Sequence, residues 1–173
     1  LLARVPGVTH AEFWPGTSAW LVDGNGIATV ATALVGPEPD SPLIELRLLA
    51  GHGLSADDPH GAVVNQAVVA GVGSLAVGDS VRVRLRGRSV AFRVAGIARE
   101  LAPMPVLYAP RAAVLAATGQ TADSTRILRV VTAGHDDAAQ RSAAGAIERE
   151  CERRGLAVAN IQRMQDAKQG ILD

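Results

Sequence analysis

The chain has few of the residues on which several common functions depend. Its single cysteine, Cys151, excludes an internal disulfide and any cysteine-rich metal cluster. Aromatic residues make up only 3% of the chain, so it offers few platforms on which nucleic-acid bases stack. Seventeen basic residues balance seventeen acidic ones, which argues against a general polyanion binder. We therefore expect no nucleic-acid partner.

Long apolar runs are also missing. The nearest candidate for a membrane span, residues 62–78, is interrupted by Asn65 and Gln66 and falls short of about 20 apolar residues. The amino terminus lacks a signal-peptide pattern and starts as the end of a helix that Pro6 and Gly7 terminate. Residues 163–173 have helix-forming composition without a stop signal. We therefore expect a segment of a longer protein.

Hydrophobic residues make up 48% of the chain, enough for a sizeable core, and glycines punctuate a series of short strands. Residues 20–34 are predicted to form a β-hairpin around the turn signal of residues 23–26. Residues 36–42 contain three prolines and form a connector. Residues 62–64 read as a buried strand, 65–75 as a short helix, 106–108 as a strand and 110–118 as a helix.

The clearest strand pattern begins after Gly78 and Asp79. Apolar residues alternate with arginines over residues 81–86, which is the period of a half-buried strand. Gly87 turns the chain, and Val90, Phe92 and Val94 return on the apolar face, before Gly96, which marks a possible bulge.

The last third of the chain predicts a β-α-β unit, with strands over residues 126–132 and 156–161. Asp136 and Asp137 begin the helix, and Gln140 is placed for a capping-box contact to Asp137. The helix carries a narrow apolar stripe. The stripe consists of Ala139, Ala143, Ile147 and Cys151. The expected architecture is an α+β fold in which an α+β layer, residues 1–42 and 120–173, carries an inserted β-rich part, residues 43–119.

The arginines of the hairpin are the most prominent polar feature. They are Arg82, Arg84, Arg86, Arg88 and Arg93. They form either an anion-binding face or the solvated side of a hairpin, and the zero net charge favours the solvated side. Trp14 and Trp20 lie within seven residues, where core packing is the ordinary role and a partner surface is the alternative. We take Trp14, Trp20, Arg82, Arg84 and Arg86 as a possible partner surface.

The sequence offers no convincing catalytic or metal site. His52, Asp57, Asp58 and His60 lie close together, but their spacing is not diagnostic of a metal and a turn explains them more simply. Cys151 lies on an apolar helix stripe with no histidine nearby in the sequence. Neither a nucleophile elbow nor a phosphate-binding glycine loop is present. We therefore expect no enzyme, no cofactor and no metal.

Six blocks of sequence, in order, resemble the extracytoplasmic core domain of MacB-like and FtsX-like ABC-transporter permeases. The opening residues 1–8 resemble the start of that domain just after the first membrane span. The other blocks are residues 48–52, 63–67, 77–81, 92–97 and 104–110. His52 stands where the family more often has arginine. Beyond Pro110 the resemblance depends only on the β-α-β tail.

The resemblance implies a porter-like α+β subdomain, residues 1–42 and 120–173, with an inserted β-rich subdomain, residues 43–119. It implies a domain on the extracytoplasmic face of the bacterial cell membrane, in a homodimeric or heterodimeric permease driven by a cytoplasmic ATP-binding subunit. Such permeases move lipoproteins, peptides or drugs, or act on an external hydrolase. The domain would be non-catalytic and would couple ATP-driven movement to events outside the membrane. Both ends, residues 1 and 173, would then lie on one side.

Two other functions stay open at this point. The first is a small β-barrel module that binds an anionic polymer through the arginine-rich hairpin. The second is a metal-dependent hydrolase centred on residues 52–60.

Overall fold

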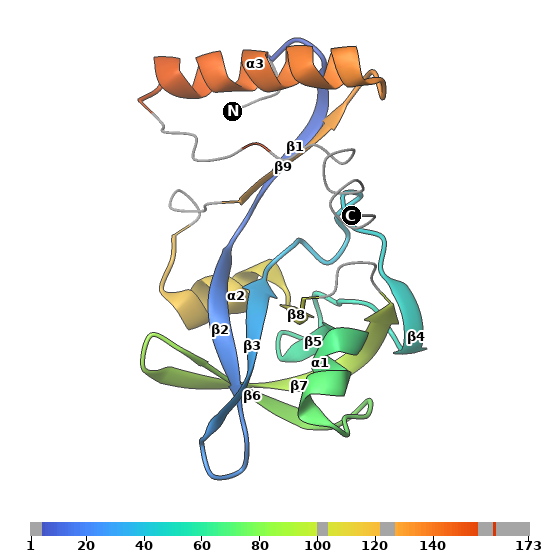
Figure 1. The fold of residues 1–173 in the computed structure, drawn as a ribbon, viewed down its shortest axis with the longest axis vertical. Helices are drawn as coiled ribbons and strands as arrows, with labels where there is room; N and C mark the ends of the chain where they lie inside the picture. The colour runs from blue at the N-terminus through green and yellow to red at the C-terminus, as the bar shows by residue number, and fades with distance from the viewer. Residues whose placement is uncertain (1–4, 100–103, 122–126, 156–160, 162–173) are drawn as a thin grey trace. The chain divides into compact units, whose positions relative to one another are not determined.

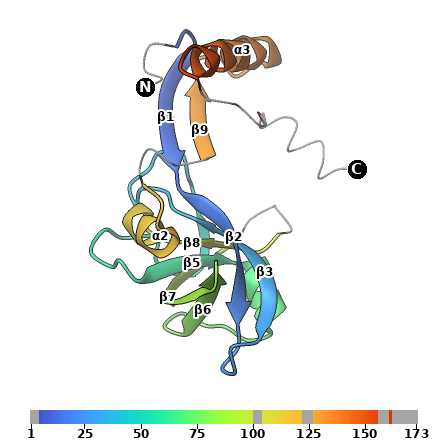
Figure 2. The same ribbon diagram turned by 90° about the vertical axis from the view of Figure 1, so that its left-hand side faces the viewer.

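A computed structural model describes residues 5–99, 104–121, 127–155 and 161 of the chain. The polypeptide divides into two compact units (Figures 1 and 2). One unit is built from both ends, Leu1–Glu12 and Arg129–Asp173, and the other from the middle, Phe13–Leu128. Among the described residues, no helix has the length and apolar character needed to cross a membrane.

The unit built from both ends contains a strand pair and one long helix. Strand β1 (Val8–Trp14) pairs with β9 (Ile127–Thr132) in a two-stranded sheet. The Thr9 hydroxyl donates to the Val131 carbonyl oxygen at 3.1 Å, and the Ala133 N–H donates to the Gly7 carbonyl oxygen at 3.0 Å. These contacts join segments from opposite ends of the chain.

Helix α3 (Asp137–Arg153) begins one residue earlier than the capping prediction required. Asp136 is extended and is the N-cap, and its side chain accepts from the Ala139 N–H at 2.8 Å. The Gln140 side chain donates to the His135 carbonyl oxygen instead of reaching Asp137. The capping-box prediction was therefore wrong in its register, because Asp136 and not Asp137 is the residue whose carboxylate accepts from an N–H group of the first turn.

The apolar stripe of α3 is present and includes an unexpected charged residue. Ala143, Ile147 and Cys151 are buried, and so is Glu150. The Glu150 carboxylate forms ion pairs with Arg153 and Arg154 in the last turn, which compensates the charge for its loss of water.

The larger unit is a closed β-barrel with an added edge strand. Antiparallel neighbours β2 (Gly16–Val22) and β3 (Ala28–Val35) form the hairpin predicted around residues 23–26. The ring continues from β3 to β8, β5, β7 and β6, and β6 pairs back with β2. These strands are β8 (Val106–Tyr108), β5 (Gly61–Asn65), β7 (Arg88–Arg99) and β6 (Ser80–Leu85).

Strand β7 has 12 residues, long enough to serve two neighbours along one side. Its first half pairs with β6, and its second half pairs with the edge strand β4 (Arg47–Gly51). On its other side β7 runs parallel to β5, and the register there skips Ala95. The bulge expected beside Gly96 is therefore present.

The barrel is filled by side chains, and two short helices close it. Phe92, Leu34 and Leu107 are among its largest buried residues. Helix α1 (Gln66–Val72) contributes Val68 to this core, and α2 (Arg111–Thr118) contributes Val114 and Ala117. The result is a mixed α and β fold, as expected.

The extent of the two units differs from the boundaries expected at residues 42/43 and 119/120. The hairpin β2–β3 belongs to the barrel unit, because β2 hydrogen-bonds to β6 and β3 hydrogen-bonds to β8. Its residues Leu21 and Leu34 join the barrel core as a consequence. The helix expected at residues 1–5, the final strand expected at residues 156–161 and the placement of both ends lie mainly outside the described residues.

Candidate partner-binding surface

The outward face of strands β2 and β6 carries an exposed tryptophan beside two arginines. Trp20 lies opposite Arg84 in the antiparallel register, and Val22 lies opposite Arg82. Side chains alternate along each strand, so Val81, Val83 and Leu85 point into the core while Arg82 and Arg84 are exposed. Trp20 is 49% exposed.

 Trp20 thus projects into solvent from the outward face, and it is not part of the barrel core.

The residues around this pair on the neighbouring strands are small. Ala31 lies opposite Trp20 on β3, Ser89 lies opposite Arg84 on β7, and Ala91 lies opposite Arg82. All three are exposed and too short to cover the neighbouring side chains. The indole and the two guanidinium groups therefore project beyond the neighbouring side chains and are accessible to a partner.

The positive charges of Arg82 and Arg84 are not balanced locally. Residues 80–93 contain five arginines and no acidic residue. Among the described residues, Arg82 and Arg84 form no ion pair with a carboxylate, and Arg84 donates instead to the Gly26 carbonyl oxygen at 3.3 Å. An anionic group at this face would gain charge-assisted hydrogen bonds without first displacing a carboxylate.

The five arginines predicted as one row do not share one face. Arg93 lies opposite Ser80 and so shares the face of Arg82 and Arg84, but it forms an ion pair with Asp58. Arg88 pairs in register with Leu85, on the core-facing side of the hairpin. Arg86 occupies the two-residue turn with Gly87, and both have positive φ, at 47° and 79°. Among the described residues, the outward-face arginines without an ion pair are therefore Arg82 and Arg84, with Arg86 at the tip.

The two tryptophans have different environments. Trp14 is only 2% exposed and packs with Val35 and Val106 in a second apolar cluster of the barrel unit. Of the predicted partner surface, Trp14 therefore belongs to the core, whereas Trp20, Arg82, Arg84 and Arg86 are exposed.

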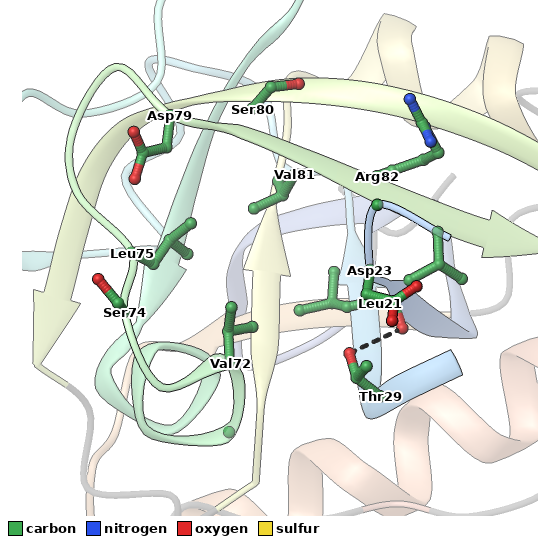
Figure 3. Close-up of a pocket in the computed structure, with 13 residues that line it drawn as sticks. Leu21, Asp23, Thr29, Val72, Ser74, Leu75, Asp79, Ser80, Val81 and Arg82 are labelled. Carbon is green, nitrogen blue, oxygen red and sulfur yellow. Dashed lines mark hydrogen bonds between the residues drawn. The ribbon is translucent and has the colours of Figure 1, made fainter. Parts of the chain in front are cut away.

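A pocket of about 450 Å³ adjoins the outward face at one end of β6 (Figure 3). Apolar side chains from α1, the loop after it and β6 line its walls, among them Val72, Leu75 and Val81. In Figure 3 the side chains of Val81 and Arg82 leave β6 on opposite sides, so Arg82 lies at the rim. Sequence reasoning missed this pocket, because its walls come from segments that are far apart in the chain.

The acidic residues of the pocket serve the backbone. Asp23 accepts from the N–H groups of Asn25 and Ile27 at 2.9 and 2.8 Å, and Asp79 accepts from the Ala76 N–H at 2.8 Å. The loop at residues 23–26 is thus a hairpin turn held by Asp23, as its turn signal predicted.

The histidine-rich loop does not gather metal ligands. Asp58 pairs with Arg93, and His52 Nδ1 donates to the Gly53 carbonyl oxygen at 2.8 Å. In the described part of the chain, no group of three or more histidine, cysteine or acidic side chains is placed to hold a metal ion. Cys151 is buried in α3, as its place on the apolar stripe predicted.

Comparison with known proteins identifies the fold. No protein-family model and no curated protein matches the sequence. Among solved structures, the periplasmic region of MacB from Actinobacillus actinomycetemcomitans is similar over 99% of this chain and 79% of that chain, with 21% identity and a TM-score of 0.61. The extracellular domain of the noncanonic ABC-type transporter YknZ from Gram-positive bacteria is similar over 90% of this chain and 81% of that chain, with 15% identity and a TM-score of 0.64.

The chain therefore has the fold of the extracytoplasmic domains of ABC-transporter permeases. Within that class its fold is that of the MacB-like periplasmic core, which confirms the resemblance seen in the six sequence blocks.

Proposed function

We propose that this chain is a non-catalytic extracytoplasmic domain of an ABC-transporter permease. It couples ATP-driven movement of the membrane part to the handling of a substrate or partner outside the membrane. The observation that carries this proposal is the fold similarity to the MacB periplasmic region, which extends over 99% of the chain. Similarity over the whole length supports a shared role more strongly than a match to one subdomain.

The proposal includes a location and partners. The domain lies on the extracytoplasmic face of the bacterial cell membrane, as part of an integral membrane protein. A cytoplasmic ATP-binding subunit drives the permease, which works as a homodimer or heterodimer. The substrate is a lipoprotein, peptide or drug.

The division into two units gives the domain a means of coupling. The unit built from both chain ends corresponds to a porter-like subdomain, and the barrel unit is inserted into it. The chain passes from one unit to the other only within β1 and β9, at residues 12/13 and 128/129. Because β1 and β9 pair with each other, a force that displaces one of these strands is also transmitted to the other.

The exposed residues of the outward face form the surface offered to a partner. Trp20, Arg82, Arg84 and Arg86 combine an accessible aromatic ring with unbalanced guanidinium groups. Tryptophan and arginine are the side chains most enriched where binding energy concentrates in protein interfaces. A barrel that binds an anionic polymer has less support, since the chain is neutral and only Arg82 and Arg84 of the outward-facing strand arginines have no ion pair.

The location is tested by labelling whole cells that produce the complete natural protein. Cys151→Ser removes the single cysteine of this segment, and Ser89→Cys places a new thiol on an exposed strand position. A membrane-impermeant maleimide is expected to label Ser89→Cys in intact cells. Labelling only after cell lysis would contradict an extracytoplasmic location.

A further inference from the structure

The charge along β6 changes sign from one end of the strand to the other. Asp79 precedes the strand beside the pocket, and Arg82, Arg84 and Arg86 follow towards the hairpin tip. A partner that lies along this strand therefore meets an apolar pocket with acidic residues at one end and unbalanced positive charge at the other.

We infer that the outward face of β2 and β6 binds an extended acidic segment of a partner protein, with an apolar residue at the end nearest the pocket. This inference rests on the proposed function, since it names the chemistry of the partner met outside the membrane. The carboxylates of the segment pair with Arg82 and Arg84, and its apolar side chain enters the pocket beside Leu75.

The spacing of the arginines suits an extended chain. Successive residues on one face of a strand are about 7 Å apart, and an extended peptide presents every second side chain at the same interval. Carboxylates at alternate positions of such a segment are therefore in register with Arg82 and Arg84. Arg84 is also held in place by the Gly26 carbonyl oxygen, so less side-chain freedom is lost when it binds.

A protein segment fits this face better than a lipid surface or a nucleic acid. Only two outward-facing strand arginines, Arg82 and Arg84, have no ion pair, because Arg93 is paired with Asp58. Membrane and polyanion binding depend on larger clusters of basic charge. Trp20 is half-exposed on β2, the strand between β6 and β3. Its ring offers apolar contact of the kind that protein interfaces use.

The experiment measures binding of a synthetic probe peptide to the 173-residue chain by titration calorimetry and by chemical-shift changes. In the probe, glutamate alternates with serine and one end carries leucine; a second peptide has glutamine in place of glutamate. We expect the glutamate peptide to bind and the glutamine peptide to bind at least about tenfold more weakly, because the charge-assisted hydrogen bonds are lost. Binding is also expected to weaken as salt is raised.

Arginine variants locate the site. The double variant Arg82→Gln, Arg84→Gln is expected to weaken binding about tenfold or more, and Leu75→Ser to weaken it less. Arg88→Gln is the matched control for the single variants Arg82→Gln and Arg84→Gln, because each removes one positive charge from the same hairpin and only Arg88 lies on its other side. The control is expected to change affinity less than about twofold. The melting temperature of each variant confirms that it is folded.

Three results would overturn the inference. The first is equal weakening by Arg88→Gln and by the outward arginine variants, which indicates general charge attraction. The second is binding to phosphatidylglycerol vesicles without binding to the glutamate peptide, which indicates a lipid surface. The third is the absence of peptide binding at low salt. None of them alters the whole-cell labelling result, so the inference fails separately from the proposed location.

Discussion

Gly51 and Gly96 lie directly opposite each other where β4 pairs with β7. Gly51 has a φ of +73°, and a side chain on it would meet the Ala95 carbonyl oxygen and the Gly96 Cα. A side chain on Gly96 would meet the His52 carbonyl oxygen. The edge strand therefore approaches the barrel so closely that neither position has room for a methyl group.

Gly51→Ala is expected to lower the free energy of unfolding by about 2–3 kcal/mol, through backbone strain at positive φ and the clash with β7. Gly53→Ala is the control, because its added methyl group would meet no atom within 4 Å. Urea unfolding followed by circular dichroism measures both variants. Equal stability of Gly51→Ala and Gly53→Ala would contradict the close approach.

Asn65 joins three segments from a fully buried position. Its side-chain oxygen accepts from the N–H groups of Val68 and Val106, each at 3.1 Å, and its amide donates to the Met104 carbonyl oxygen at 2.8 Å. Asn65→Leu leaves these groups without their partner, so we expect a loss of stability of about 3 kcal/mol or more. Ser18→Ala, at an exposed position of β2, is expected to cost less than about 0.5 kcal/mol. A loss of similar size in both would contradict this role of Asn65.

Substitution of the two tryptophans is expected to lower stability by different amounts. Trp14→Ala removes a buried ring and is expected to cost about 3–5 kcal/mol of stability. Trp20→Ala removes a half-exposed ring and is expected to cost less than about 1 kcal/mol. Acrylamide quenching of the single-tryptophan variants Trp14→Phe and Trp20→Phe checks the same difference. Stronger quenching of the fluorescence of Trp14 than of Trp20 would contradict the assigned burial.

Arg86 is the one non-glycine residue with positive φ in the described part of the chain. With Gly87 it forms a two-residue hairpin turn of the kind in which asparagine is favoured at the first position. Arg86→Asn is therefore expected to stabilise the chain by about 0.5 kcal/mol and to raise the melting temperature by about 1–2 °C. Arg88→Asn, outside the positive-φ turn, is expected to give no gain. A lower melting temperature for Arg86→Asn would contradict the turn assignment.

Local patterns in the sequence predicted the strands and turns well. The alternation of Val81, Val83 and Leu85 with arginine gave the correct inward and outward faces of β6, because a strand has a side-chain period of two. The prediction that Arg88 lies in one row with Arg82 and Arg84 was wrong. The turn at Arg86 and Gly87 brings Arg88 opposite Leu85, and directly opposite residues of a strand pair share one face.

Closure of the barrel could not be predicted, because it depends on pairings between distant segments. Leu21 pairs with Val83, and Leu34 pairs with Leu107, and no local pattern encodes either pair. The burial of Trp14 likewise depends on Val35 and Val106, which arrive from other strands. Glu150 was missed for another reason, since a charged residue is not expected on a buried stripe unless its ion pairs are known.

The proposed coupling role requires the two units to move relative to each other when the permease binds and hydrolyses ATP. The most direct test is a spin-label distance measurement on the full permease with its ATP-binding subunit. In a Cys151→Ser background, labels at Arg149→Cys on α3 and Ala91→Cys on β7 report the distance between the units. We predict that the distance distribution differs between the nucleotide-free and ATP-trapped states. An identical distribution in both states would contradict the claim.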